Sequence, residues 1–402
     1  MDYSSYIVDK IKSMGESQTI AVSEKAKQLK KQGVDVISFA TGEPDFDTPD
    51  NIKEKAIASI RAGHTKYTAV AGIDELKSAI CAKLKQENHL DYSPDQVLVS
   101  CGAKHTMYNV SQVLFDAGDE VIIFSPYWVT YPAQVRLCGA APVFVDTTTS
   151  SDMTISEDGL QKGITDKTKA IILCSPSNPS GKVYSKKELE IVAKAAIEHD
   201  LIIIADEIYE KLIYDDFEFV SIAALGEDVK ERTITVNGVG KAFAMTGWRI
   251  GYAAGPREII DAMRKMQGQA TSNPNSIAQH AAVEALSASS ASVEQMRKEY
   301  QKRRDVVVET LNTIEGFSCR KPEGAFYVFP RVAALYSKGF GDRIINNSVD
   351  LCSYLLDEAH AALVPGVAFG CDEYVRLSFA TDLETIKTGL ERIKHAVEKL
   401  SA

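Results

Sequence analysis

Lys241 and Arg249 lie in a segment of small residues. Residues 238–251 read Gly-Val-Gly-Lys-Ala-Phe-Ala-Met-Thr-Gly-Trp-Arg-Ile-Gly, so glycines flank the lysine and an arginine follows eight residues later. A lysine amine in this setting suits a Schiff base with an aldehyde cofactor, and the arginine suits the phosphate of that cofactor. The alternative interpretation is a solvated lysine in a loop, which the segment by itself does not exclude.

Residues 100–104 indicate a second contact for a phosphate. They read Ser-Cys-Gly-Ala-Lys, and they stand between a strand pattern and a helical pattern that continues to Leu114. Backbone N–H groups at the start of a helix bind anions, and Gly102, Ala103 and Lys104 would supply them. A plain turn between a strand and a helix is the alternative.

Asp206 ends an almost wholly apolar strand pattern, where an unpaired carboxylate is costly to bury. In one interpretation it pairs with the protonated ring nitrogen of a cofactor and makes the ring an electron sink, while Tyr209 reaches a neighbouring ring oxygen. In the other, Asp206 caps a helix that begins at Glu207. Trp128, one of two tryptophans, either stacks on a flat heteroaromatic ring or packs in the core.

Arg376 lies in a short strand pattern at residues 375–379. An arginine in such a strand ordinarily forms an ion pair at the surface. In a cleft, its planar guanidinium would instead bind a carboxylate through two parallel hydrogen bonds, which a lysine does less well. Both interpretations stay open from the residues alone.

Length, charge and cysteine content narrow the class of protein. The chain has 402 residues, 45% of them hydrophobic, and a formal net charge of −10. This length favours two domains, and the charge argues against nucleic acid or an anionic membrane as the main partner. The seven cysteines are scattered without a C-x-x-C pair, so we expect neither a disulfide framework nor a metal site. With no signal-peptide pattern and no apolar run of about 20 residues, we expect a cytoplasmic protein.

The middle of the chain alternates strand and helix patterns, which predicts an α/β fold with a largely parallel sheet. A further apolar run at residues 250–254 follows the preceding strand too closely for a crossover helix, so we expect it to be antiparallel. The parallel strands are predicted at residues 97–99, 120–124, 170–173, 201–205 and 233–236.

One strand–helix–strand crossover can be recognised in detail in the sequence. Ser185 and Glu188 form a capping box that starts a helix. The apolar stripe of this helix consists of Leu189, Val192, Ala193, Ala196 and Ile197. The crossover makes the flanking strands parallel, so the loops after them open at one edge of the sheet, where ligands bind in open α/β folds. Asn178, Asp206 and Lys241 follow such strand ends, and we expect them to converge on one crevice.

The two ends of the chain differ from its middle. Residues 1–49 carry a helical pattern and a turn, and residues 291–402 carry long charged helices and alternating strand patterns. We therefore expect residues 50–290 to form a large domain. The two ends are expected to pack together as a smaller α+β domain.

Together these motifs resemble those of the class I (fold type I) pyridoxal-phosphate aminotransferases. Within that family the chain is most similar to the bacterial aspartate aminotransferases of the aspartate/prephenate subgroup, and so many motifs in one order argue against coincidence. The resemblance implies a large domain with a mostly parallel seven-stranded sheet. The matching motifs are residues 42–46 (Gly-Glu-Pro-Asp-Phe), 66–67 (Lys-Tyr), 178–181 (Asn-Pro-Ser-Gly), 206–209 (Asp-Glu-Ile-Tyr), the segment around Lys241, 322–327 (Pro-Glu-Gly-Ala-Phe-Tyr) and 375–378 (Val-Arg-Leu-Ser).

The resemblance implies pyridoxal 5'-phosphate as the cofactor and Lys241 as the residue that forms the Schiff base and then transfers protons as acid and base. Tyr67 corresponds to a tyrosine that reaches the phosphate from the neighbouring subunit, which implies a homodimer with shared active sites. The other cofactor contacts match Asp206 at the pyridine nitrogen, Tyr209 and Asn178 at the phenolic oxygen, Trp128 on the ring face, and Arg249 with the backbone of Gly102, Ala103 and Lys104 at the phosphate.

The resemblance also implies small amino acids and 2-oxo acids as substrates. Arg376, with Asn178, Trp128 and the backbone of Gly42, matches the site for the substrate α-carboxylate. One subgroup binds a distal carboxylate with an arginine in the region of residues 267–276, where this chain has none. The subgroup that this chain resembles uses a lysine and two hydroxyl groups, which match Lys104, Ser17 and Thr19. A solvated Lys104 in the first turn of a helix is the alternative.

Two positions depart from the family pattern. Many members carry serines where this chain has Gly238 and Gly240, so two hydroxyl contacts to the phosphate are expected to be lost; Ser180 in place of threonine is a mild change. The expected reaction moves the amino group of aspartate to 2-oxoglutarate in two half-reactions. The alternatives are a prephenate or aromatic aminotransferase, a carbon–sulfur lyase on the same fold, and a non-catalytic regulator that binds the cofactor.

Overall fold

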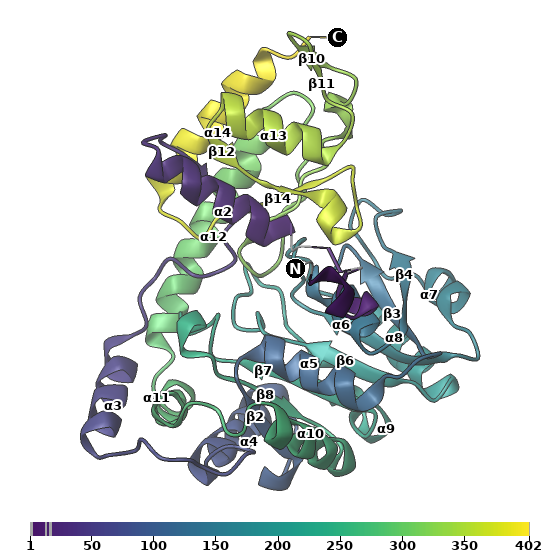
Figure 1. The fold of residues 1–402 in the computed structure, drawn as a ribbon, viewed down its shortest axis with the longest axis vertical. Helices are drawn as coiled ribbons and strands as arrows, with labels where there is room; N and C mark the ends of the chain where they lie inside the picture. The colour runs from purple at the N-terminus through teal and green to yellow at the C-terminus, as the bar shows by residue number, and fades with distance from the viewer. Residues whose placement is uncertain (1–2, 13, 16–17, 402) are drawn as a thin grey trace.

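The computed structural model describes residues 3–12, 14–15 and 18–401 (Figure 1). Within them, the largest sheet has seven strands in the order β2-β8-β7-β6-β5-β3-β4. β8 is antiparallel to its neighbours β2 and β7, and the other pairings are parallel. The strands are β2 (Val97–Ser100), β3 (Glu120–Ser125), β4 (Ala141–Asp146), β5 (Thr168–Cys174), β6 (Ile202–Asp206), β7 (Thr233–Gly238) and β8 (Gly251–Ala254).

This sheet confirms the α/β prediction and six of the strands, including the antiparallel β8. β4 was not predicted from the sequence. It lies at the edge of the sheet next to β3, and most of its residues are exposed or half-buried. An edge strand of this kind contains Pro142 and lacks the continuous apolar run by which the buried strands were found.

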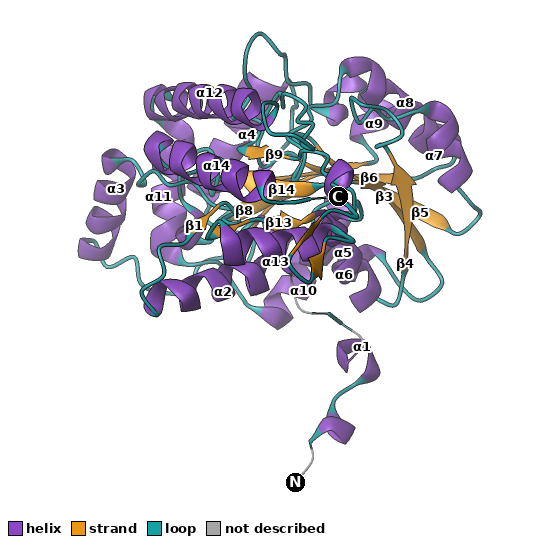
Figure 2. Cartoon of the chain, turned by 90° about the horizontal axis from the view of Figure 1, so that it is seen from above, coloured by secondary structure: helices purple, strands orange, loops and turns teal. Residues whose placement is uncertain are grey.

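Helices cover both faces of the sheet because the side chains of a strand alternate between the two faces (Figures 1 and 2). In β6, for example, Ile203 and Ile204 belong to different buried clusters. On one face lie α5 (Ala103–Leu114), α6 (Thr130–Leu137) and α10 (Arg257–Ala270). On the other lie α4 (Asp74–Asn88), α7 (Glu157–Gly163), α8 (Lys186–Glu198), α9 (Glu227–Lys230) and α11 (Ser276–Ser287). α3 (Asp50–Arg61) packs against α11.

The predicted crossover is confirmed: Ser185 caps α8 in a capping box with Glu188, and α8 connects the parallel strands β5 and β6. One residue of its predicted apolar stripe is wrong. Ile197 is 43% exposed, because it lies roughly 90° around the helix from the centre of the stripe at 3.6 residues per turn. The other stripe residues are buried.

Segments from both ends of the chain pack together beyond the sheet. β1 (Ile37–Ser38) pairs in parallel with β12 (Ala361–Ala362), and β14 (Val375–Ser378) lies between β13 (Val364–Pro365) and β9 (Tyr327–Val328). β10 (Gly339–Phe340) and β11 (Arg343–Ile344) form a separate antiparallel pair. The surrounding helices are α2 (Gln18–Lys31), α12 (Ala291–Leu311), α13 (Ser348–Glu358) and α14 (Leu383–Glu398).

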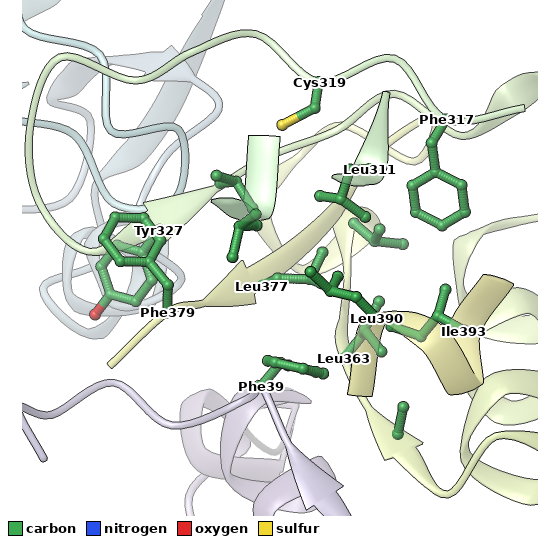
Figure 3. Close-up of a cluster of buried hydrophobic side chains, with 14 of the residues drawn as sticks. Phe39, Leu311, Phe317, Cys319, Tyr327, Leu363, Leu377, Phe379, Leu390 and Ile393 are labelled. Atoms are coloured by element: carbon green, nitrogen blue, oxygen red, sulfur yellow. The ribbon is translucent and has the colours of Figure 1, made fainter. Parts of the chain in front are cut away.

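One large buried cluster joins these end segments. Figure 3 shows Phe39, from the start of the chain, beside Leu377, Leu390 and Leu363, from its end. At the N-terminus, α1 (Asp9–Lys12) contacts α6, and the segment before α1 extends away from the rest of the chain (Figure 2). The domain limits at residues 49/50 and 290/291 stay a prediction. None of the helices in the described part of the chain is long and apolar enough to cross a membrane.

Candidate functional site

A cavity of about 530 Å³ lies where the loops after β2, β5, β6 and β7 meet β9 and β14. Its position agrees with the crevice expected at the carboxyl ends of parallel strands. Most of the residues singled out from the sequence line it, and they come from seven separate segments of the chain. They are Gly42, Gly102, Ala103, Lys104, Trp128, Asn178, Asp206, Tyr209, Lys241, Arg249 and Arg376.

The structure does not bring all of the predicted residues to this cavity. Tyr67 is 90% exposed and is absent from the lining among the described residues. Ser17 lies outside the described residues, and so does the side chain of Thr19, whose backbone belongs to α2. The roles assigned to these three residues stay predictions.

Lys241 lies three residues after β7, in a loop with unusual backbone geometry. Ala244 and Arg249 both adopt left-handed conformations, with φ of 50° and 57°, which cost energy in residues other than glycine. The Lys241 Nζ donates a hydrogen bond to the carbonyl of Gly42. Burial lowers the pKa of this amine to about 8, although the nearby Glu43 carboxylate raises it. An unusually large fraction of this amine is therefore in the unprotonated, nucleophilic form.

Asp206 is the last residue of β6 and only 4% exposed. Its carboxylate accepts hydrogen bonds from the Tyr131 hydroxyl at 2.7 Å and from the Ile208 backbone N–H at 3.4 Å. Burial raises the pKa of this carboxyl, and the hydrogen bond from Tyr131 opposes the rise. The alternative that Asp206 caps a helix is wrong, because a turn and not a helix begins at Glu207.

Arg249 and the start of α5 form a compact corner for an anion. The Arg249 guanidinium donates to the carbonyls of Thr246 at 2.8 Å and Cys101 at 3.2 Å. It lies so close to Gly102 that a Cβ at that glycine would be 2.2 Å from its Nη2. The N-cap Gly102 and the first residues of α5, Ala103 and Lys104, line the cavity together with Arg249. A helix start beside a guanidinium is a binding site for phosphate.

Arg376 is 2% exposed, yet no ion pair among the described residues involves it. Its guanidinium donates to the Asn178 Oδ1 at 3.0 Å and to the Ala40 carbonyl at 2.8 Å, and its Nε has no partner. The centre of the Tyr327 ring lies 4.6 Å from the guanidinium carbon of Arg376. A buried cation that lacks an anion but lines a cavity is prepared to bind a carboxylate.

Lys104 and Trp128 form another wall of the cavity. The Lys104 Nζ lies 5.0 Å from the centre of the Trp128 ring, and burial, with a smaller effect of Arg249, lowers the pKa of this amine. Trp128 borders the cavity and also packs against a buried cluster beside the sheet, so its role as the ring-stacking residue stays a prediction. Of the described residues that line the cavity, five are basic and three are acidic, so the site favours anionic ligands. They are Lys27, Lys104, Lys241, Arg249 and Arg376, and Glu24, Glu43 and Asp206.

Several residues that contact the predicted ones were not assigned a role from the sequence. Tyr131 bonds to Asp206, and the Tyr327 hydroxyl lies 2.9 Å from that of Tyr209. Glu43 accepts a hydrogen bond from Thr246 at 2.9 Å within the cavity. Tyr131 follows Trp128 by three residues and its ring packs edge-on against that of Trp128, but Trp128 precedes α6, so helical spacing did not indicate this contact. Tyr327 and Glu43 stood inside quoted motifs without an assigned role.

Comparisons with known proteins agree with this geometry. A family model described as aminotransferase class I and II matches residues 34–393. The chain is 47% identical over 394 residues to an aspartate aminotransferase of Bacillus sp. (strain YM-2), covering 98% of this chain and 99% of the relative. It is 48% identical over 398 residues to a probable aspartate/prephenate aminotransferase of Rickettsia prowazekii, covering 98% and 100%.

Solved structures give the same result. The aspartate aminotransferase of Rhizobium meliloti is 44% identical and superposes with a TM-score of 0.95, covering 98% of this chain and 99% of that one. The aspartate aminotransferase of Thermus thermophilus with maleate is 42% identical with a TM-score of 0.91, covering 97% and 99%. These similarities extend over nearly the whole chain, so they include both ends as well as the seven-stranded sheet.

Proposed function

Because the chain belongs to the class I and II aminotransferases, we propose that it transfers the amino group of aspartate to 2-oxoglutarate with pyridoxal 5'-phosphate as its cofactor. Relatives named aspartate aminotransferase support this choice of substrate. The observation that carries the proposal is one cavity lined by the Lys241 amine, with a pKa of about 8, the buried Asp206 carboxylate and the Arg376 guanidinium, for which no ion pair is seen among the described residues.

The cavity fits this cofactor at three points. Arg249 and the start of α5 would hold the phosphate, the Trp128 ring would lie on the pyridine ring, and Asp206 would accept the proton of the ring nitrogen. When bound, pyridoxal phosphate supplies an aldehyde that bonds reversibly to amines and a conjugated ring that draws electrons from the substrate Cα. The Tyr209 hydroxyl and the Asn178 amide would bind the phenolic oxygen.

Lys241 would bond to the cofactor and also move protons. With a pKa of about 8, roughly one amine in ten is unprotonated at pH 7, against fewer than about one in a thousand for an ordinary lysine. Its Nζ can therefore take a proton from the substrate Cα and return it near neutral pH, as general acid–base catalysis requires. The hydrogen bond to the Gly42 carbonyl orients the free amine.

Arg376 would bind the α-carboxylate of the substrate with two parallel hydrogen bonds, because its Nε is unpaired and its guanidinium is already oriented by Asn178 and Ala40. Lys104 would bind the distal carboxylate of aspartate, and Ser17 and Thr19 are proposed to assist it. The excess of basic side chains in the cavity suits a substrate with two carboxylates.

We also propose a homodimer in which Tyr67 reaches the phosphate of the neighbouring subunit. The exposure of Tyr67 in the single chain supports this role. The exposed Tyr3, Tyr6 and Ile11 of the N-terminal segment give an apolar surface that a second copy would cover. For location we propose the cytoplasm, since all seven cysteines are free thiols.

Single-turnover absorbance spectra of the holoenzyme test the function. Aspartate alone should convert the bound cofactor to its amine form, and 2-oxoglutarate should restore it; phenylalanine and cystathionine should react far more slowly. If aspartate leaves the spectrum unchanged, the proposal fails. Lys241→Ala should remove both the lysine-bound absorbance and turnover from a folded protein, and steady turnover in that variant would refute the role of Lys241.

Substrate choice needs its own comparison. Lys104→Ala should raise the KM for aspartate at least about tenfold while changing that for phenylalanine little. Lys27→Ala removes the same charge from another wall of the cavity and serves as the matched control. Equal effects of the two variants on aspartate would contradict a specific role for Lys104.

Prephenate is a second candidate, because several relatives carry the name aspartate/prephenate aminotransferase. Prephenate also carries two carboxylates, so the cations that suit aspartate suit it as well. Two reactions are compared by kcat/KM: aspartate with 2-oxoglutarate, which forms glutamate, and prephenate with glutamate as the amino donor. The ratio of the two values decides between an enzyme dedicated to one substrate and an enzyme that uses both.

A further inference from the structure

We propose that Glu210 and Asn237 form a brace, held by Lys83, that sets the position of Lys241 relative to Asp206 and Tyr209. The inference rests on the proposed cofactor, because the brace would matter by aligning the groups that hold it. None of its three residues lines the cavity among the described residues. They are therefore positioning residues, which act through their neighbours.

The backbone pairing between β6 and β7 ends where the functional residues begin. The last pair in register is Asp206 with Val236, and the Glu207 N–H donates to the Val236 carbonyl at 2.9 Å. Beyond this point the chain after β6 turns through Tyr209, and the chain after β7 continues to Lys241. No further strand pairing joins these two segments directly within the described residues, although Gly238 still pairs with Gly251 of β8, so a direct link between the two segments comes from side chains.

Asn237 supplies that connection with both ends of its amide. Its Nδ2 donates to the Glu210 Oε1 at 2.8 Å, and its Oδ1 accepts from the Gly238 backbone N–H at 2.7 Å. Glu210 is the next residue after Tyr209, and Gly238 lies three residues before Lys241. Asn237 is only 3% exposed. A single buried amide thus links the turn that carries Tyr209 to the strand end that carries the lysine.

Lys83 of α4 anchors the other side of Glu210. Its ammonium forms an ion pair with the Glu210 carboxylate and donates to the Asn88 Oδ1 at 2.6 Å. The Asn88 Nδ2 donates to the second Glu210 oxygen, also at 2.6 Å. Burial is the largest influence and would raise the pKa of Glu210, but the charge and hydrogen bond of Lys83, with smaller contributions from Asn88 and Lys211, together lower the pKa below its usual value. Glu210 therefore stays ionised and is a strong acceptor for Asn237.

The groups proposed to hold the cofactor need a fixed position relative to one another. A ligand held at its ring nitrogen by Asp206, at its ring oxygen by Tyr209 and through a covalent bond by Lys241 tolerates little relative movement of these groups. Misplacement by about 1 Å costs roughly 100-fold in rate. Gly238 is also close-packed, since a Cβ there would lie 2.8 Å from the Ile250 carbonyl oxygen. The strand end is thus confined on one side by backbone and on the other by Asn237.

Asn237→Ala tests the proposal in the holoenzyme, and Asn88→Ala is the matched control. Each removes one buried amide that bonds to Glu210, but only Asn237 reaches Gly238. Asn237→Asp is the second test variant: it keeps the shape and the acceptor for the Gly238 N–H, but loses the donor to Glu210. The measurements are the dissociation constant for pyridoxal phosphate, the pH midpoint of the absorbance of the bound cofactor, and the urea midpoint of unfolding.

We expect Asn237→Ala and Asn237→Asp to weaken cofactor binding at least about tenfold and to shift the pH midpoint of the cofactor absorbance. Asn88→Ala should stay within about twofold of the wild-type dissociation constant, with a similar loss of stability. Wild-type binding and an unmoved midpoint in both Asn237 variants would overturn the proposal. A loss of the same size in Asn88→Ala would overturn it too, because general destabilisation would then explain the effect. These readouts do not involve aspartate, so failure of aspartate as a substrate would be recognised separately.

Discussion

Tyr131→Phe removes one oxygen atom from the support of Asp206. The Tyr131 hydroxyl donates to Asp206 at 2.7 Å in a fully enclosed setting, and its ring packs edge-on against Trp128 with centroids 5.3 Å apart. Phenylalanine keeps that ring and its packing. The variant therefore isolates the hydrogen bond to the carboxylate from the shape of the site.

The size of the effect follows from the charge of the acceptor. A hydrogen bond to a charged group contributes about 1.5–3 kcal/mol, and each 1.4 kcal/mol is a factor of ten in binding. Burial already raises the pKa of Asp206, so the loss of the Tyr131 donor raises it further. We expect the affinity for pyridoxal phosphate to fall by about 10- to 100-fold. The loss should grow as the pH falls, because the variant protonates Asp206 at higher pH than the wild type does.

The assay is an absorbance titration of cofactor-free protein with pyridoxal phosphate between pH 6 and pH 8. Tyr127→Phe is the control, since it makes the same chemical change on the same segment, where the Tyr127 ring stacks on Phe144 instead of bonding to Asp206. A dissociation constant for Tyr131→Phe within twofold of wild type across this pH range would refute the reasoning. The Asp206 carboxylate would then not depend on Tyr131 for its charge.

Three further changes probe the carboxylate site, a buried acid and the helix start. Arg376→Lys should raise the KM for aspartate about 100-fold with unchanged cofactor affinity, because an ammonium lacks the planar pair of donors; a fall in cofactor affinity instead would contradict this. Burial raises the pKa of Glu207 to about 8. Its usual value is 4.5, so the unfolded chain ionises first and wild-type stability falls as the pH rises between these values. Glu207→Gln should lack this fall in urea unfolding at pH 5 and pH 8; identical pH dependence would exclude the buried proton. A Cβ at Gly251 would lie 2.2 Å from the Ala103 backbone nitrogen. Gly251→Ala should therefore destabilise the fold by about 1–3 kcal/mol, whereas Gly240→Ala, with its nearest atom at 3.7 Å, should be tolerated; thermal unfolding compares the two.

Much of the sheet could be predicted because its strands are local patterns. The buried strands are continuous apolar runs, and the capping box at Ser185 marks the start of α8 within four residues of sequence. The antiparallel β8 followed from the short connection after β7 alone. The edge strand β4 escaped because it is half exposed, and half-exposed strands resemble loops in composition.

Some residues of the candidate site could likewise be predicted from the sequence, and others could not. Lys241, Asp206 and Asn178 could be placed together because strand ends of a parallel sheet share an edge, and motif order in the chain pointed to the family. Tyr131 could not be assigned to Asp206, which lies 75 residues away, because the choice depends on how α6 packs on the sheet. The turn after Asp206 was likewise open, since the same residues suit a helix start.

Residue types and their order therefore predicted the chemistry proposed for this protein: an amine for an aldehyde, a guanidinium for a phosphate, and a carboxylate at a strand end. Only the tertiary structure decided the electrostatics of these groups. The Arg376 guanidinium meets Asn178 and Ala40 from 198 and 336 residues away, and burial, not sequence spacing, lowers the pKa of Lys241 to about 8. Charge states in a cavity depend on solvent exclusion and on partners distant in the chain, so no local pattern of residues contains them.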